Sequence, residues 1–219
     1  MITLYGFGRQ HRGMMGKSRD LRAQWALEET GLPYRVHGLD FIGGEPEGPT
    51  YSRISWFHQV PAIDDDGFIV AESGAVLLYI AEKAGKLIPR DFEGRMRVVQ
   101  WCFAALTTVE PPLWEIQMID AFGGGEASNS RRPALVKQAE RRLADLEGRL
   151  DGREWIACAD FTVADILLAA VLRQVRKIGL IDPYPRLKEY YARAFARPAW
   201  ERTLETYAER LGVPVADIR

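Results

Sequence analysis

Cysteine, histidine and long apolar runs are all scarce in this chain. Only two cysteines and three histidines occur among its 219 residues. Cys102 and Cys158 both lie in apolar segments, which favours buried thiols in a reducing compartment over a disulfide framework. The sequence has no run of 18 apolar residues and no signal peptide. We therefore expect a cytoplasmic protein that does not enter a membrane.

An excess of charge of either sign is also missing. Lys and Arg together number 29, against 30 for Asp and Glu, and this balance gives no reason to expect nucleic acid as a partner. The three histidines, His11, His37 and His58, lack paired metal-ligand spacing, so we expect no metal site. What the chain does have is 47% apolar residues, enough for one or two compact domains with a substantial core.

The predicted elements divide the chain into a mixed part and an all-helical part. The mixed part contains strand 2–5, helix 21–29, strand 34–37, a hairpin with Asp-Gly at its tip near 64–67, and helix 73–80. Helices follow at 92–119, 131–150, 162–178, 184–195 and 198–211, with a kink at Pro111-Pro112 and a glycine connection at 123–125. We predict an N-terminal domain at 1–84, a linker at 85–91 and a helical domain at 92–219.

The segment Gln59-Val60-Pro61 is the most informative of the chain. Proline restricts the preceding residue to extended geometry. A cis bond would turn the strand at Val60 and leave its amide and carbonyl free to pair with an extended peptide. A strand that simply begins at Pro61 is the structural alternative.

Glu72 and Ser73 follow eleven residues after Pro61, at the head of an apolar helix. The unpaired N–H groups of that helix start would bind a carboxylate, and the Glu72 carboxylate would bind an ammonium group. Together, the two residues can recognise both charges at the end of an amino acid.

These residues match, in order and spacing, the glutathione site of cytosolic glutathione transferases. The stretch 25–34 also resembles the end of the family's first helix and its second strand. The resemblance covers nearly the whole chain and implies a thioredoxin-like α/β domain followed by an all-α domain. It also implies a cis Val60-Pro61 bond, glutathione held by Gln59, Val60, Pro61, Glu72 and Ser73, a homodimer, and a role in detoxification.

Ser18 is the candidate for activating the thiol. In theta-like and delta-like transferases a catalytic serine stands four residues before an arginine, as Ser18 stands before Arg22. The surrounding positions 1–22 carry five basic side chains against one acidic, which favours a thiolate. The alternatives are a Ser18 that only caps the helix and a catalytic Tyr5. The segment 6–17 is longer than the family's usual loop and would form a lid or reshape the substrate pocket.

Of two other motifs, one is structural and the other is excluded as a phosphate-binding loop. Thr162 and Asp165 form a predicted capping box, a folding device that matches a capped helix in the family. The stretch 13–18 resembles a phosphate-binding loop, but His11 stands where that motif requires glycine.

The sequence thus predicts a serine-type glutathione transferase that adds the thiolate to a small hydrophobic electrophile. A glutathione-dependent isomerase or dehalogenase, and a non-catalytic interaction module, remain as alternatives. The absence of cysteine from the loop disfavours cysteine-dependent reductase chemistry.

Overall fold

The computed structural model describes residues 1–123 and 125–219. The predicted glycine connection therefore includes one residue, Gly124, that lies outside the described residues. Two compact units are present: one joins 1–86 with 197–219, and the other spans 87–196. The proposed boundaries at 84 and 92 remain a prediction, and the last helix makes its contacts in the first unit.

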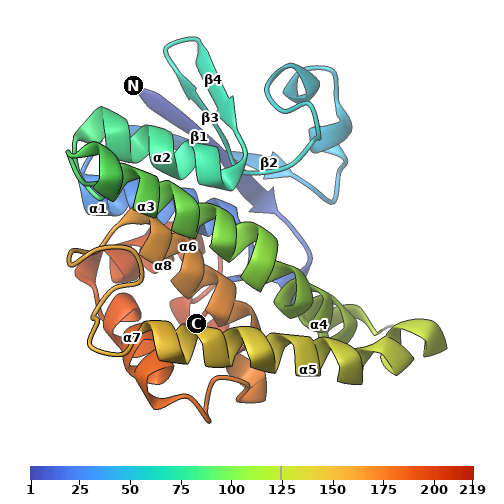
Figure 1. Cartoon of the computed structure of the whole chain (residues 1–219). Helices are drawn as coiled ribbons and strands as arrows, with labels where there is room; N and C mark the ends of the chain where they lie inside the picture. The colour runs from blue at the N-terminus through green and yellow to red at the C-terminus, as the bar shows by residue number, and fades with distance from the viewer. Residues whose placement is uncertain (124) are drawn as a thin grey trace. The chain divides into compact units, whose positions relative to one another are not determined.

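A four-stranded mixed sheet forms the centre of the first unit (Figure 1). Its strands are β1 (Ile2–Arg9), β2 (Tyr34–Asp40), β3 (Ala62–Asp65) and β4 (Phe68–Ala71), in the order β2-β1-β3-β4. β1 and β2 are parallel, as expected for a crossover through a helix, whereas β3 pairs antiparallel with both β1 and β4. This is the thioredoxin-like arrangement that the sequence predicted, and the fold class is confirmed.

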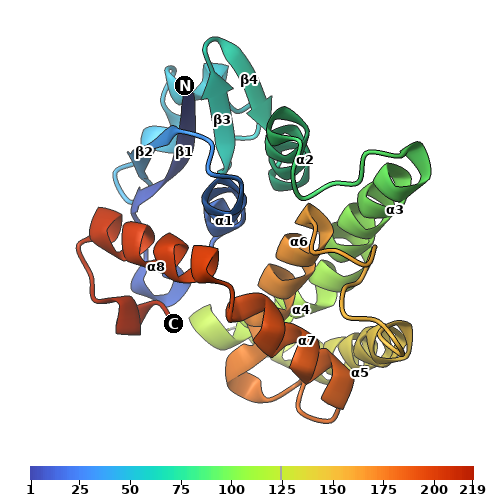
Figure 2. The same cartoon turned by 90° about the vertical axis from the view of Figure 1, so that its left-hand side faces the viewer.

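Three helices complete this unit: α1 (Asp20–Thr30), α2 (Ser73–Ala84) and α8 (Pro198–Leu211). Figure 2 shows α1 beside α2 near the sheet, and α8 packs on α1. Trp25 of α1 is fully buried, and its ring lies 4.9 Å from that of Trp200 of α8 in a tilted arrangement. Arg197 donates two hydrogen bonds, of 2.6 and 2.8 Å, to the Glu29 carboxylate. These contacts fix the C-terminal helix to the start of the chain.

The second unit is helical. It comprises α3 (Phe92–Phe103), the π-helix η4 (Ala104–Val109), α4 (Glu110–Phe122), α5 (Glu126–Arg149), α6 (Val163–Leu172), the 3-10 helix η5 (Arg173–Ile178) and α7 (Pro185–Phe195). At the position of the predicted kink, the π-helix η4 ends at Val109 and α4 begins at Glu110, one residue before Pro111 and Pro112. Prolines lack the N–H of an α-helical hydrogen bond, so the pattern changes there.

The start of α6 carries the predicted capping box. Asp165 is fully buried and accepts hydrogen bonds from the Thr162 amide and hydroxyl, each at 2.9 Å. Burial raises the pKa of Asp165, while these hydrogen bonds oppose the rise. The contacts of Asp165 all serve to hold the helical unit together, which agrees with its interpretation as a stability residue.

Among the described residues, no helix is long and apolar enough to cross a membrane.

Candidate functional site

A small pocket in the first unit brings together the residues that the sequence singled out for peptide binding. Its lining contains all five of them and two further residues: Gln59, Val60, Pro61, Glu72, Ser73, Arg19 and Ser55. The Val60-Pro61 peptide bond is cis. The β3-β4 hairpin accounts for this convergence, because it returns the chain from Pro61 to Glu72 at the same end of the sheet.

Val60 packs against a cluster of apolar and aromatic side chains. It packs in a group of buried side chains with Leu39 and Tyr51, against which Tyr5 also lies. The Tyr51 hydroxyl donates to the Gln59 carbonyl at 2.8 Å, and the Ser55 hydroxyl accepts from the Gln59 amide at 3.1 Å. The backbone on both sides of Gln59 is therefore fixed before any ligand binds.

The opposite wall of the pocket is the start of α2. Glu72 has φ of 70°, a left-handed value that is uncommon for a residue with a side chain. The first helical hydrogen bond runs from the Val76 amide to the Glu72 carbonyl at 2.9 Å, which leaves the amides of 73–75 without a helical partner. Within the described part of the chain, no side chain caps this helix start. Such a start attracts an anion.

Ser18 lies next to the pocket in sequence but does not line it; its neighbour Arg19 does. The Ser18 side chain is 6% exposed and its hydroxyl lies 2.7 Å from the Tyr207 hydroxyl. The residue at the N-cap of α1 is Arg19, and no described side chain caps this helix. The Ser18 hydroxyl thus contacts α8, and helix capping is not its role.

Tyr5, the other candidate donor, is part of the packed core of the sheet. Its ring lies 5.3 Å from that of His37 and 5.7 Å from that of Tyr51. Burial raises the pKa of Tyr5, with Asp64 adding to the rise. These contacts favour a packed strand tyrosine over a catalytic one.

The long segment after β1 differs from its prediction as a loop. β1 extends to Arg9, and a 3-10 turn follows at Arg12–Met14. Gly16 has φ of +70°, and a side chain there would collide with the carbonyl oxygen of Ile218. Only glycine fits this close approach to the C-terminal segment. The Tyr207 hydroxyl contacts the side chains of both Ser18 and Gln10, and the local sequence gave no signal of these contacts.

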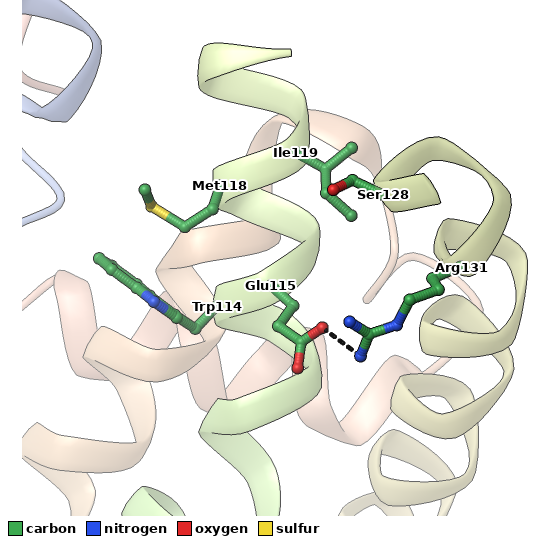
Figure 3. Close-up of a pocket in the computed structure, with 6 residues that line it drawn as sticks. All are labelled: Trp114, Glu115, Met118, Ile119, Ser128 and Arg131. Atoms are coloured by element: carbon green, nitrogen blue, oxygen red, sulfur yellow. Dashed lines mark hydrogen bonds and ion pairs between the residues drawn. The ribbon is translucent and has the colours of Figure 1, made fainter. Parts of the chain in front are cut away.

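A second pocket lies within the helical unit, between α4 and α5 (Figure 3). Trp114, Met118 and Ile119 contribute apolar surface to it. On its other side, Arg131 donates to the Glu115 carboxylate at 3.0 Å.

In the described part of the chain, the cysteines and the potential metal ligands form no further reactive or metal-binding site. Cys102 is buried and Cys158 partly buried, and both are free. Burial raises the pKa of Cys102 to about 12, so its thiol remains protonated near neutral pH. Within 1–123 and 125–219, no cluster of three or more His, Cys, Asp or Glu side chains is arranged to hold a metal ion.

Comparisons with known proteins agree with this geometry. Residues 12–82 match the model of the glutathione S-transferase N-terminal domain, and residues 129–193 match that of the C-terminal domain. A solved glutathione transferase family member from Pseudomonas fluorescens, with two glutathione bound, is 30% identical. The match covers 93% of this chain and 92% of that one, with a TM-score of 0.83.

Two curated relatives show the range of the similarity. Glutathione S-transferase F9 of Arabidopsis thaliana is 27% identical over 201 residues, which cover 85% of this chain and 92% of that protein. The disulfide-bond oxidoreductase YfcG of Escherichia coli K12 is 29% identical over 197 residues, covering 81% and 86%. The chain belongs to the glutathione S-transferase family.

Proposed function

We propose that this protein is a glutathione transferase that binds glutathione along Val60, stabilises its thiolate and adds the sulfur to a hydrophobic electrophile. The observation that carries the proposal is the convergence of Val60, Glu72 and Ser73 in one pocket. An extended backbone segment, an acidic side chain and a helix start complement the amide, ammonium and carboxylate groups of the tripeptide.

Each group has an assigned part in binding. The Val60 backbone pairs with the cysteinyl unit, and Glu72 binds the ammonium of the γ-glutamyl unit. The α2 amides near Ser73 bind the γ-glutamyl carboxylate, while Gln59 reaches the glycyl carboxylate. The fixed backbone around Gln59 favours binding, because little conformational entropy is lost there.

Catalysis requires that the bound thiol ionise at neutral pH. Lowering a thiol pKa of about 8.5 by two units requires about 2.7 kcal/mol of preferential interaction with the anion. A hydrogen bond to a charged group contributes about 1.5–3 kcal/mol, and a helix start about 0.3–1 kcal/mol. The Ser18 hydroxyl and the start of α1 together can therefore supply the interaction energy that the thiolate requires. We assign the hydrogen bond to Ser18.

The helical unit supplies the apolar surface for the second substrate in this proposal. The candidate is the pocket of Trp114, Met118 and Ile119.

We also propose that the protein is a homodimer. Trp56 and Phe57, which lie shortly before the binding segment, are 88% and 74% exposed, and burial of such aromatic side chains favours association. Sedimentation analysis of the purified protein tests for a dimer.

Ser18→Ala tests the catalytic assignment. With glutathione bound, the ultraviolet thiolate band of the variant should appear at higher pH than in the wild type, by about one to two units. Conjugation of a model aromatic halide should fall by about three- to 25-fold near neutral pH, with the loss of thiolate. An unchanged band would remove Ser18 from the mechanism and leave Tyr5 as the candidate donor.

Disulfide reduction is a second candidate function. Two observations favour it: the relative from Pseudomonas fluorescens holds two glutathione molecules, and YfcG is named a disulfide-bond oxidoreductase. A bound thiolate would attack one sulfur of the substrate disulfide and release a thiol. A second glutathione would then attack the mixed disulfide, giving glutathione disulfide and the second thiol. Assays with a small disulfide, a halide and an isomerisable substrate separate the enzymatic alternatives, and a non-catalytic module would be inactive in all three.

A further inference from the structure

Three buried side chains from the two ends of the chain meet at the Tyr207 hydroxyl. The Gln10 amide nitrogen donates to it at 2.5 Å, and the Ser18 hydroxyl lies 2.7 Å away. Gln10 is 5% exposed, Ser18 6% and Tyr207 0%. Tyr207 belongs to α8, and both of its partners lie in the segment between β1 and α1, so the C-terminal helix contacts the proposed catalytic serine.

The donors in this cluster determine where each proton lies. The nitrogen of the Gln10 side-chain amide can only donate, so the Tyr207 oxygen accepts from it. The phenol proton then needs an acceptor, and Ser18 is the other hydrogen-bonding partner of this hydroxyl among the described residues. With the Gln10 amide oriented so that its nitrogen faces Tyr207, the phenol donates to Ser18 Oγ. The proton of Ser18 itself is not used within the cluster and can be donated to a third group.

The Tyr207 ring is held in place by charged groups on both helices. The Arg210 guanidinium of α8 lies 4.7 Å from the ring centre and donates to Asp20 of α1 at 2.8 Å. Asp20 also accepts from the Phe7 amide at 3.1 Å. These contacts join β1, α1 and α8 around Ser18, so rotation of the phenol out of the cluster would break several interactions at once.

Tyr207 remains a neutral donor over the working pH range. Burial raises the pKa of Tyr207 well above its usual value, and the Asp20 carboxylate raises it further. The hydrogen bonds to Ser18 and Gln10, and the charge of Arg210, act in the opposite direction without reversing the shift. A phenol that keeps its proton can orient Ser18 at every pH at which glutathione ionises.

We propose that Tyr207 is a positioning residue that orients the Ser18 hydroxyl so that its proton is donated to the sulfur of bound glutathione. The inference rests on the proposed function, in which Ser18 stabilises the thiolate. A hydroxyl that already accepts a hydrogen bond is also a stronger donor. The chain Gln10, Tyr207, Ser18 is then a relay that strengthens the final donor.

Tyr207→Phe is the test, because it keeps the ring over Arg210 and removes only the hydroxyl. The thiolate band of bound glutathione should move to higher pH by about one unit, a smaller shift than in Ser18→Ala. Below the pH of the wild-type band, kcat should fall about tenfold. The KM for glutathione should stay within about twofold, since Tyr207 does not line the pocket. The matched control is Tyr190→Phe, another buried tyrosine that loses its hydroxyl, in the helical unit. It should leave the band and kcat unchanged.

The outcomes separate this inference from the proposed function. A band that moves in Ser18→Ala but not in Tyr207→Phe overturns the role of Tyr207 and leaves Ser18 in place. A band that moves in neither variant overturns the assignment of Ser18 itself. An equal shift in Tyr190→Phe would attribute the effect to general loosening and would also overturn the inference.

Gln10→Leu provides a second route if Tyr207→Phe does not fold. Without the Gln10 donor, the Tyr207 proton is no longer directed to Ser18, and Ser18 can donate to Tyr207 instead. The thiolate band of bound glutathione should again move to higher pH, by less than in Ser18→Ala. An unshifted band in the folded Gln10→Leu protein contradicts the relay.

Discussion

Replacing Asp165 by alanine should destabilise the helical unit more than almost any other single polar change. The carboxylate accepts from the Ile156 amide at 2.9 Å and from the Tyr190 hydroxyl at 3.1 Å. It also accepts from the amide and hydroxyl of Thr162, both at 2.9 Å. Alanine leaves these buried donors without their acceptor.

The size of the effect follows from these contacts. Each buried donor left unsatisfied costs about 1–3 kcal/mol, and loss of the cap costs about 0.5–2 kcal/mol. Relief from burying a charge offsets part of this total, so we expect a net loss of about 3–5 kcal/mol. Domains of this kind have about 5–15 kcal/mol of stability in total. The variant should therefore lose a large fraction of its stability.

Urea unfolding followed by circular dichroism measures the change. Asp160→Ala is a matched control, because Asp160 is exposed a few residues away and should change stability by no more than about 0.5 kcal/mol. A double-mutant cycle with Tyr190→Phe should give a coupling energy of about 1 kcal/mol, since removing both partners leaves no orphaned hydroxyl. Equal midpoints for Asp165→Ala and Asp160→Ala would show that the hydrogen bonds of the Asp165 carboxylate do not stabilise the helical unit.

Two further predictions concern the first unit. Glu72→Gln should weaken glutathione binding by about fivefold in a calorimetric titration, because an exposed pair with an ammonium is worth about 1 kcal/mol, and unchanged affinity would remove Glu72 from the site. For Asp65, the Lys83 ammonium hydrogen-bonds the carboxylate and lowers its pKa, with Tyr79 adding to the effect. A lowered folded pKa stabilises the protein above the ordinary value of about 4 and loses this contribution as the pH falls through the folded value. The wild type should therefore unfold at higher urea than Lys83→Met near neutral pH, and the two midpoints should converge below about pH 4; a constant gap would contradict this linkage.

Local chemistry explains the parts of the fold that the sequence predicted well. Pro61, the Asp-Gly turn of the hairpin and the apolar run after Ser73 each act within a few residues. Their spacing brings Val60, Glu72 and Ser73 into one pocket. The fold class and the family followed from this pattern.

Helix ends were harder to place. The sequence predicted a helix from 131, but α5 begins at Glu126 and continues through Pro133. Pro133 deprives the Asn129 carbonyl of its helical donor. Asn129 is exposed, and water can replace that hydrogen bond, so the proline does not end the helix.

Long-range polar contacts had no local signal at all. Ser18 and Tyr207 are 189 residues apart, and Gln10 and Tyr207 are 197 apart. A serine before a helix has the same local pattern whether its hydroxyl caps that helix or contacts a distant tyrosine. Only the packing of α8 on α1 distinguishes the two.

Titration of the purified protein with reduced glutathione in a calorimeter shows whether the pocket of Val60, Glu72 and Ser73 binds the tripeptide and ionises its thiol. The proposed mechanism predicts saturable binding with one site per chain, accompanied by proton release near neutral pH as the bound thiol ionises. Absence of both heat and thermal stabilisation at millimolar glutathione would contradict it, and binding without proton release would contradict the thiolate mechanism.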